Sequence, residues 1–128
     1  MRLDMTGAPW GSSHSEPVRA GGLLFVSGQV PRDSEGRAVC VGDIVGQTRY
    51  VFDKLAAVLS KAGRDLGDLV VLRTYLVSRD TLPGYLTTRA EFLTSRPVCT
   101  TVFVAGLSDT DFLLEVEAVA DAEGRRTG

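Results

Sequence analysis

The segment from Phe112 to Ala120 constrains the fold more than any other part of this 128-residue chain. Two sets of residues alternate along it: Phe112, Leu114, Val116, Ala118 and Ala120 in one set, and Leu113, Glu115, Glu117 and Val119 in the other. Successive side chains of a strand point to opposite faces, so this pattern predicts a strand whose first set lies in the core. The second set holds two carboxylates but is too apolar for a face in open water. It predicts a sheet face covered by other copies of the chain, with polar groups gathered in a pocket between them.

Four other segments read as strands. Residues 17–20 and 23–27 flank Gly21-Gly22, and a Gly-Gly pair between two extended runs is a strong hairpin signal. Residues 69–77 form an apolar, β-branched run that is typical of a central strand, and residues 99–105 form a further strand before the turn at 106–109.

Two helices are expected between these strands. Residues 43–62 carry a stripe of apolar side chains at helical spacing, with Asp43 as N-cap and Gly63 as the stop. A second helix is expected from about Leu82 to Leu93, with Pro83 in its first turn, where a missing N–H costs little.

The predicted order is therefore β-β-α-β-α-β-β. Two helices cannot cover both faces of such a sheet, so an α+β fold is expected with both helices on one face of a mixed sheet. The length suits one domain spanning residues 1–128, with a core from about residue 14 to 121.

Composition excludes several classes of function. The net charge is −2 and basic residues are scattered, so no nucleic-acid partner is expected. No apolar run is long enough to cross a membrane and no secretory signal is evident, which predicts a cytoplasmic protein without a membrane partner. Two distant cysteines and one histidine do not suggest a disulfide framework or a zinc site, so no metal or cofactor is expected.

Cys99 is the first candidate for chemistry, because it follows Pro97 and opens a strand, where a side chain can be presented at a sheet end. The alternative is a small, inert thiol, the more common state of a free cysteine. His14 is the second candidate, and its alternative is a solvated loop residue.

Glu115 and Glu117 form the third candidate, because burial and mutual repulsion on one strand face raise the pKa of such pairs. The alternative is an edge position with both side chains in water. Ser27 and Gly28 are candidates for holding a ligand oxygen through a hydroxyl and backbone N–H groups, although a strand ending at Gly28 explains them equally well. Thr101, with Phe103 and Ala105 or their alternates on the same strand, is expected to lie on the same face as the two glutamates.

Several segments together resemble the RidA/YjgF family of enamine/imine deaminases. The matching stretches run in order over about residues 14–120, and they are Ala20 to Pro31, Gln47-Thr48-Arg49, Leu59 to Gly63, Pro97 to Val102, and Leu114 to Ala120. The resemblance implies a chorismate-mutase-like fold. It also implies a homotrimer whose three sheets enclose a central barrel, with three small-molecule sites between subunits.

The family's activity implies water attack on an enamine or imine, with release of ammonia. The resemblance makes Glu115 the pocket glutamate and Ser27 the pocket serine. Cys99 stands at the position of the arginine that grips the substrate carboxylate, and His14 stands at the position of a tyrosine. A thiol cannot form the bidentate fork of an arginine, which removes about 1.5–3 kcal/mol of charge-assisted binding.

Three functions stay open on this basis. The first is a divergent enzyme that adds water to an imine, an enamine or a related carbonyl intermediate, with Glu115 positioning water, Ser27 holding an oxygen and His14 acting as acid or base. The second is covalent chemistry by Cys99 with His14, as a hydrolase, isomerase or cyclase. The third is a non-catalytic trimer that binds a small metabolite or a partner protein in the same pockets. Ser27, Gly28, Thr101 and Glu117 are the expected substrate-binding residues. Endoribonuclease activity is attributed to some members of the family, and the charge of this chain gives it no support.

Overall fold

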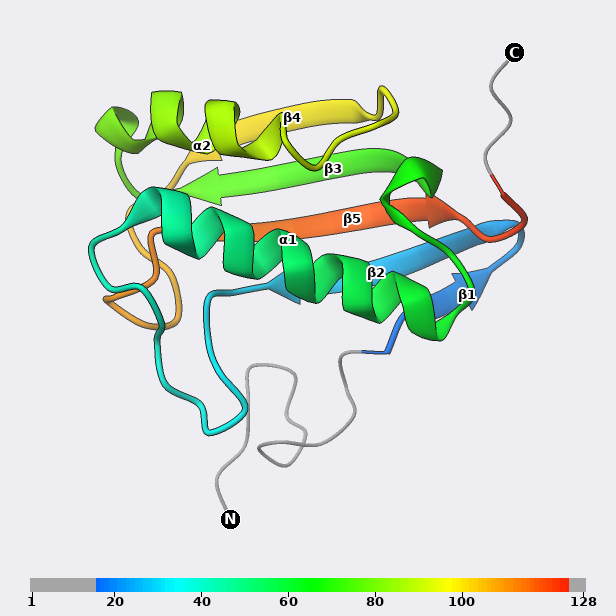
Figure 1. Ribbon diagram of the computed structural model, residues 1–128, viewed down its shortest axis with the longest axis horizontal. Helices are drawn as coiled ribbons and strands as arrows, with labels where there is room; N and C mark the ends of the chain where they lie inside the picture. The colour runs from blue at the N-terminus through cyan, green and yellow to red at the C-terminus, as the bar shows by residue number, and fades with distance from the viewer. Residues whose placement is uncertain (1–15, 125–128) are drawn as a thin grey trace.

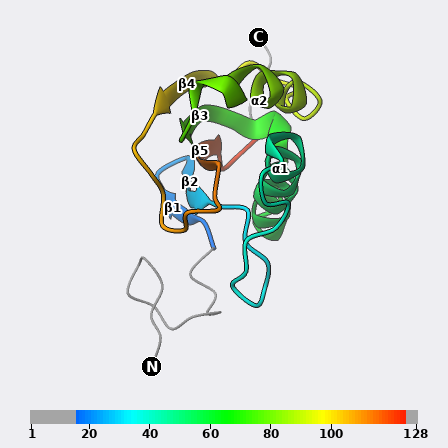
Figure 2. The same cartoon turned by 90° about the vertical axis from the view of Figure 1, so that its left-hand side faces the viewer.

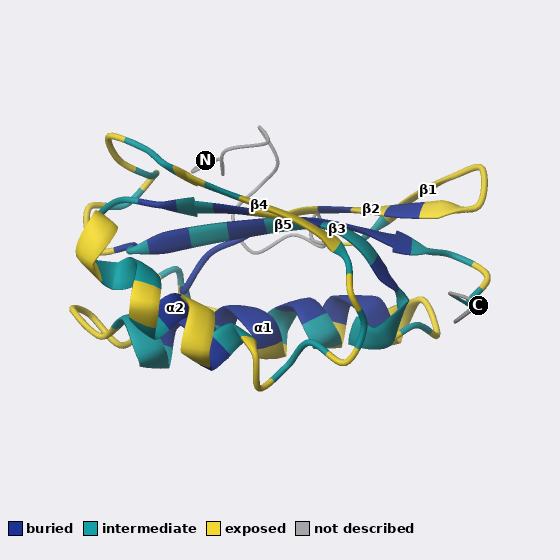
Figure 3. Cartoon of the chain, turned by 90° about the horizontal axis from the view of Figure 1, so that it is seen from above, coloured by how far each residue is buried: buried dark blue, intermediate teal, exposed yellow. Residues whose placement is uncertain are grey.

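The computed structural model describes residues 16–124 and contains one five-stranded sheet with two helices packed on one of its faces (Figure 1). Views from the side and from above show both helices on the same side of the sheet (Figures 2 and 3). The elements in chain order are β1 (Val18–Ala20), β2 (Leu23–Gln29), α1 (Ile44–Lys61), the 3-10 helix η1 (Leu66–Asp68), β3 (Leu69–Leu76), the 3-10 helix η2 (Arg79–Thr81), α2 (Leu82–Arg89), β4 (Val98–Phe103) and β5 (Leu114–Asp121). The predicted order and the one-sided placement of the helices are confirmed.

The strand order in the sheet is β1-β2-β5-β3-β4. Antiparallel pairing joins β1 to β2, β2 to β5 and β5 to β3, whereas β3 and β4 are parallel. The parallel pair needs a crossover, and α2 supplies it. The last strand in the sequence, β5, therefore lies at the centre of the sheet.

The predicted turn and cap residues act as expected. Gly21 has a φ of 60° in the turn between β1 and β2, a left-handed conformation that favours glycine. The Asp43 carboxylate accepts a hydrogen bond from the Gly46 N–H at 3.0 Å, which caps α1. Gly63, with a φ of 72°, follows the end of that helix.

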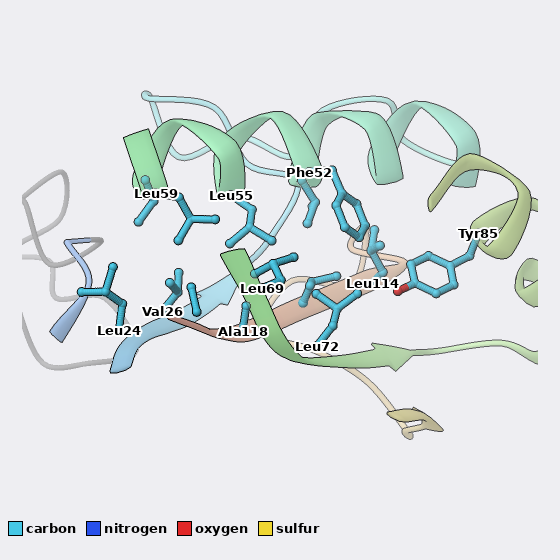
Figure 4. Close-up of a cluster of buried hydrophobic side chains, with 14 of the residues drawn as sticks. Leu24, Val26, Phe52, Leu55, Leu59, Leu69, Leu72, Tyr85, Leu114 and Ala118 are labelled. Atoms are coloured by element: carbon cyan, nitrogen blue, oxygen red, sulfur yellow. The ribbon is translucent and has the colours of Figure 1, made fainter. Parts of the chain in front are cut away.

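The core lies between the helices and the sheet (Figure 4). Phe52 and Leu55 of α1 pack on Leu72 of β3 and on Leu114 and Ala118 of β5, as the alternation in the sequence predicts. Figure 4 also shows Tyr85 of α2 directed toward the sheet. Its hydroxyl hydrogen-bonds with that of Thr74, so the buried phenol has a polar partner.

The second helix is shorter than the sequence predicts, because α2 ends at Arg89 and not near Leu93. The backbone tightens after Arg89, with Glu91 N–H donating to Thr88 O and Phe92 N–H donating to Arg89 O. Phe92 and Leu93 nevertheless pack against the core, and the Phe92 ring stacks on Phe52 with centroids 5.4 Å apart. Their apolar spacing thus indicated burial without requiring a helix.

The start of β5 also differs, because the strand begins at Leu114 and not at Phe112. The buried side chain of Gln47 donates to Asp111 O at 2.8 Å and accepts from the Leu113 N–H at 2.8 Å. The Gln47 side chain therefore supplies hydrogen bonds to the backbone just before β5, where the sequence predicted strand pairing.

The second face of the sheet carries no helix in the described chain (Figure 3). Large apolar side chains are exposed there on the outer strands, with Phe25 45% exposed and Val98 67% exposed. We call this second face the open face. Its residues include Val18 of β1, Leu23 and Phe25 of β2, Arg73 and Tyr75 of β3, Val98 and Val102 of β4, and Glu115 and Glu117 of β5. None of the helices within residues 16–124 is long and apolar enough to cross a membrane.

Candidate functional site

A β-bulge in β2 marks the candidate site. Val26 pairs with Ala118 and Gln29 pairs with Val116, so Ser27 and Gly28 together face one residue of β5, Glu117. A bulge places one extra residue in a strand and is often found beside functional sites. Gln29 supports this one by donating its side-chain amide to Ser27 O at 3.0 Å.

Glu115 packs directly against Gly28. A Cβ atom on residue 28 would overlap Oε2 of Glu115 and would lie 2.7 Å from its Cδ. Gly28 does not have a left-handed backbone conformation, so the reason for glycine here is space for the carboxylate. The sequence predicted that Ser27, Gly28 and Glu115 belong to one site, and the structure brings the three together.

The environment of Glu115 favours its protonated form. Burial raises the pKa of this half-buried carboxyl, and the negative charge of Glu117 raises it further, while the positive charge of Arg32 opposes both. The sequence predicted this direction for the pair, and the structure places both side chains on the open face. A raised pKa makes the carboxyl a weaker acid, a property that suits a group that holds and returns a proton.

Glu117 has a partner of its own on the neighbouring strand. The Tyr75 hydroxyl donates to Oε1 of Glu117 at 2.5 Å. This hydrogen bond is the main reason that the pKa of Tyr75 is raised, so the phenol keeps its proton and remains a donor. The proposed binding residue Glu117 is thus held in place by a residue that the sequence analysis did not single out.

The segment after β2 brings Arg32 close to Glu115, and α1 fastens that segment. Lys54 donates to Val30 O at 2.9 Å and to Arg32 O at 3.3 Å, and the Tyr50 hydroxyl donates to Arg32 O at 3.2 Å. Burial is the main cause that lowers the pKa of Lys54 to about 8, and the nearby charge of Arg32 adds to it. The backbone beside the site is therefore anchored by two side chains of one helix.

Cys99 and Thr101 lie on the other side of the sheet. Cys99 pairs with Leu72 and Thr101 pairs with Thr74, and both partners are buried under the helices. The open face receives the alternate residues of β4 instead, among them Thr100. Cys99 is exposed at this edge strand, where its Sγ donates to Pro97 O at 3.5 Å.

Cys99 and Glu115 are consequently separated within one chain. Cys99 of β4 pairs with Leu72 along one edge of β3, whereas Glu115 of β5 pairs with Tyr75 along the other edge. Two strand spacings and three residues of rise put their Cα atoms on the order of 14 Å apart, with side chains on opposite faces. His14, the predicted partner of Cys99, lies outside the described residues.

The sequence analysis missed Tyr75 and Arg32. Tyr75 alternates with the buried residues Leu72, Thr74 and Leu76, so the strand pattern places it on the open face. Its pairing with Glu115, however, depends on the register between β3 and β5, which the sequence does not give. Arg32 follows the strand in a loop, and no periodic signal places a loop residue. Among residues 16–124 no cluster of His, Cys, Asp and Glu has the arrangement of a metal site.

Comparisons with known proteins agree with this architecture. The family model described as Endoribonuclease L-PSP matches residues 8–122. A RutC family protein of Pyrococcus horikoshii is 34% identical over 111 residues, which cover 86% of this chain and 87% of the relative. The 3-aminoacrylate deaminase RutC of Acinetobacter baylyi is 30% identical over 103 residues, covering 80% and 82% of the two chains.

Solved structures share the fold. A protein of Thermotoga maritima superposes with a TM-score of 0.77 at 32% identity, covering 90% of this chain and 87% of the other. A YjgF-family protein of Mycobacterium tuberculosis superposes with a TM-score of 0.73 at 29% identity, covering 85% and 86%. With the family model matched from residue 8 to residue 122 and the sheet and helices shared with these structures, the chain belongs to the Endoribonuclease L-PSP family, also called the YjgF/RidA family.

Proposed function

We propose that this protein is a deaminase that adds water to an enamine or imine and releases ammonia. The observation that carries the proposal is Glu115, a half-buried carboxyl with a raised pKa that packs on Gly28 in a β-bulge. The similarity to a relative named 3-aminoacrylate deaminase supports the same class of reaction.

The proposed reaction needs one acid and one ordered water. Protonation of the enamine carbon gives an iminium, and the water oxygen then bonds to the carbon of the C=N group with loss of a proton. The carbinolamine breaks its C–N bond, nitrogen leaves as ammonia, and a carbonyl forms. Glu115 supplies and recovers the proton and orients the water, while the exposed Ser27 hydroxyl holds the oxygen.

The complete site is proposed to lie between two copies in a homotrimer. Glu115 and Cys99 are on opposite faces of one chain, so a ligand that meets both requires a second copy. The exposed apolar residues of the open face, such as Phe25 and Val98, give a second copy a surface to cover. In this arrangement Cys99 and Thr101 come from one subunit, and Ser27, Gly28, Glu115 and Glu117 come from its neighbour.

Cys99 bears on which substrates are used. A thiol does not grip a carboxylate as an arginine does, so enamines without a carboxylate are expected to be turned over at least as well as those with one. The Cys99→Arg variant is expected to lower KM for a carboxylate-bearing enamine about tenfold, which corresponds to about 1.4 kcal/mol. KM for an uncharged enamine is expected to change less than twofold.

The test is ammonia release from freshly generated enamines, measured against the uncatalysed rate. Wild-type protein is expected to accelerate release, and Glu115→Gln is expected to reduce kcat by at least a hundredfold. Glu123→Gln is the matched control, because Glu123 is an exposed acid that forms an ion pair with Arg19 at the far end of the sheet. Full activity of Glu115→Gln would contradict the role of Glu115. Ligand retention without turnover by the wild type would instead indicate a metabolite-binding protein.

A further inference from the structure

Tyr75 is an unexpected neighbour for the proposed catalytic acid. In the β3–β5 ladder Tyr75 stands directly opposite Glu115, and Arg73 stands opposite Glu117. The Tyr75 hydroxyl nevertheless hydrogen-bonds with Glu117, at 2.5 Å from its Oε1. The phenol therefore reaches diagonally across the ladder and leaves Glu115 without it, a geometry that long side chains of paired strands permit.

We propose that Tyr75 is a positioning residue for Glu115: its hydroxyl fixes the Glu117 carboxylate on the same face of β5 as Glu115, and the fixed negative charge favours the protonated form of Glu115. The proposal rests on the function assigned to Glu115 above. It adds a residue that does not touch the substrate but sets the protonation state of the one that does.

Among residues 16–124, the charged side chains near Glu115 come from β5, from β3 and from the segment after β2. Glu117 comes from the same strand and Arg32 from the segment after β2. On β3, Arg73 and Tyr75 lie level with the two acids, and on β2 the adjoining residues Ser27 and Gly28 carry no charge. Burial makes the largest contribution to the raised pKa of Glu115, and Glu117 makes the next largest, against Arg32.

A mobile Glu117 would lose this effect. Glutamate has three rotatable side-chain bonds, and on a face with exposed positions it would turn toward water, where its field at Glu115 is screened. The charge-assisted bond from Tyr75 selects one rotamer and one oxygen. The raised pKa of Tyr75, caused first by this bond, keeps the donor proton in place over the neutral pH range.

The experiment is a carboxyl titration of the full-length protein, in which glutamate side chains are labelled with carbon-13 and the Glu115 resonance is assigned by its loss in Glu115→Gln. Tyr75→Phe keeps the ring and removes only the hydroxyl, and Glu117→Gln removes the charge but keeps the acceptor. The titration midpoint of Glu115 is expected to fall in both variants, and to fall at least as far in Glu117→Gln. Glu123→Gln, which removes an exposed acid elsewhere, is expected to leave the midpoint unchanged.

A midpoint that stays in place in Tyr75→Phe while falling in Glu117→Gln would overturn the role of Tyr75. A midpoint that stays in place in both would overturn the role of the Glu117 charge as well. Circular dichroism and a thermal melt of each variant establish that it is folded before the titration is read.

Turnover separates this inference from the proposed function. In the pH profile of kcat, the limb on which activity falls with rising pH is expected to move to lower pH in Tyr75→Phe, in parallel with the titration. At pH 8 kcat is expected to fall about threefold while KM stays within twofold, because ligand contacts are unchanged. Absence of enamine hydrolysis in the wild type would overturn the function, whereas the titration alone decides what Tyr75 does to Glu115.

Discussion

The two faces of the sheet are made from the same strands but are closed in different ways. On one face Leu114, Val116 and Ala118 of β5 are buried under α1 and α2 by the chain itself. On the other face, within the part of the chain that the structure describes, the alternate residues Glu115 and Glu117 of that strand meet neighbouring strands and the segment after β2. One face therefore supplies stability within the chain, and the other supplies chemistry and a surface for association.

This difference shows how a small domain combines a packed core with a polar site. A half-buried carboxyl costs free energy, and the structure keeps that cost away from the packed side. The bulge in β2 and the missing side chain of Gly28 give Glu115 its space without disturbing Val26, which remains 4% exposed in the core.

The largest expected effect is on the helix-covered face. Phe52 is fully buried and stacks on Phe92, so Phe52→Ala is expected to lower the free energy of unfolding by about 3–5 kcal/mol. Urea denaturation followed by circular dichroism measures the change. Leu86→Ala on the exposed side of α2 is the control, with an expected loss below about 1 kcal/mol. Equal losses for the two variants would remove the contrast between the faces.

The next effect tests whether the open face is covered. Phe25→Asp places a charge among the apolar side chains of that face and is expected to dissociate the proposed trimer. Light scattering would then give a mass of 13.7 kDa in place of three times that value. Val41→Asp changes an exposed apolar residue outside the sheet and is expected to leave the assembly intact. A wild-type protein that is monomeric at micromolar concentration would contradict the arrangement.

A smaller effect is expected at the bulge. Gly28→Ala forces the flexible end of the Glu115 side chain to move, which is expected to cost less than about 1 kcal/mol of stability but to reduce kcat at least tenfold. Gly22→Ala is the matched control, because a Cβ there meets no atom within 4 Å and the backbone is not left-handed. If the two alanine variants have the same melting temperature and activity, close packing of Glu115 on Gly28 is not required.

The smallest effect is a pH dependence of stability. Glu115 has a pKa that is raised on folding, so its favourable contribution is complete below the pKa of the unfolded chain and is lost as the pH rises through the folded value. Glu115→Gln is therefore expected to gain stability relative to wild type at pH 8 but not at pH 4. Solvent screening limits the gain to less than about 1 kcal/mol. A gain that is larger at pH 4 would reverse the sign and contradict the environment described for Glu115.

The sequence was sufficient to predict the strands and helices, but not the register in which the strands pair. The alternation from Phe112 to Ala120 identified the core strand, and Asp43, Gly21 and Gly63 identified a cap and two turns, because these signals are local. The neighbours of Glu115 depend on the register of β5 against β3 and on a bulge in β2, both of which are set by tertiary packing. Tyr75 and Arg32 were missed for that reason.

The candidate residues show the same limit. The alternation along β5 predicted one face for Glu115 and Glu117, and both lie on the open face. Ser27 and Gly28 were grouped with Glu115 only through the family resemblance, and the structure places Gly28 against Glu115. Thr101 was assigned with its alternates left open, and the parallel β3–β4 register places it under the helix-covered face, beside Thr74. The face of a parallel edge strand cannot be read from its own sequence when both sets of its residues are similarly polar.

The extra residue in β2 also affects how a chain of this kind tolerates insertions and deletions. Removing Gly28 would leave Ser27 opposite Glu117 and the residue that follows opposite Val116, which is a regular antiparallel ladder. Every side chain of β2 before the bulge would stay on the same face of the sheet. A deletion nearer the start of the strand would move buried apolar side chains to the opposite face, where they would be exposed to water. The strand β2 can therefore lose one residue beside Glu115 and keep its other side chains on their faces. The spacing of the residues around Glu115 can thus change while the packing of the core is kept.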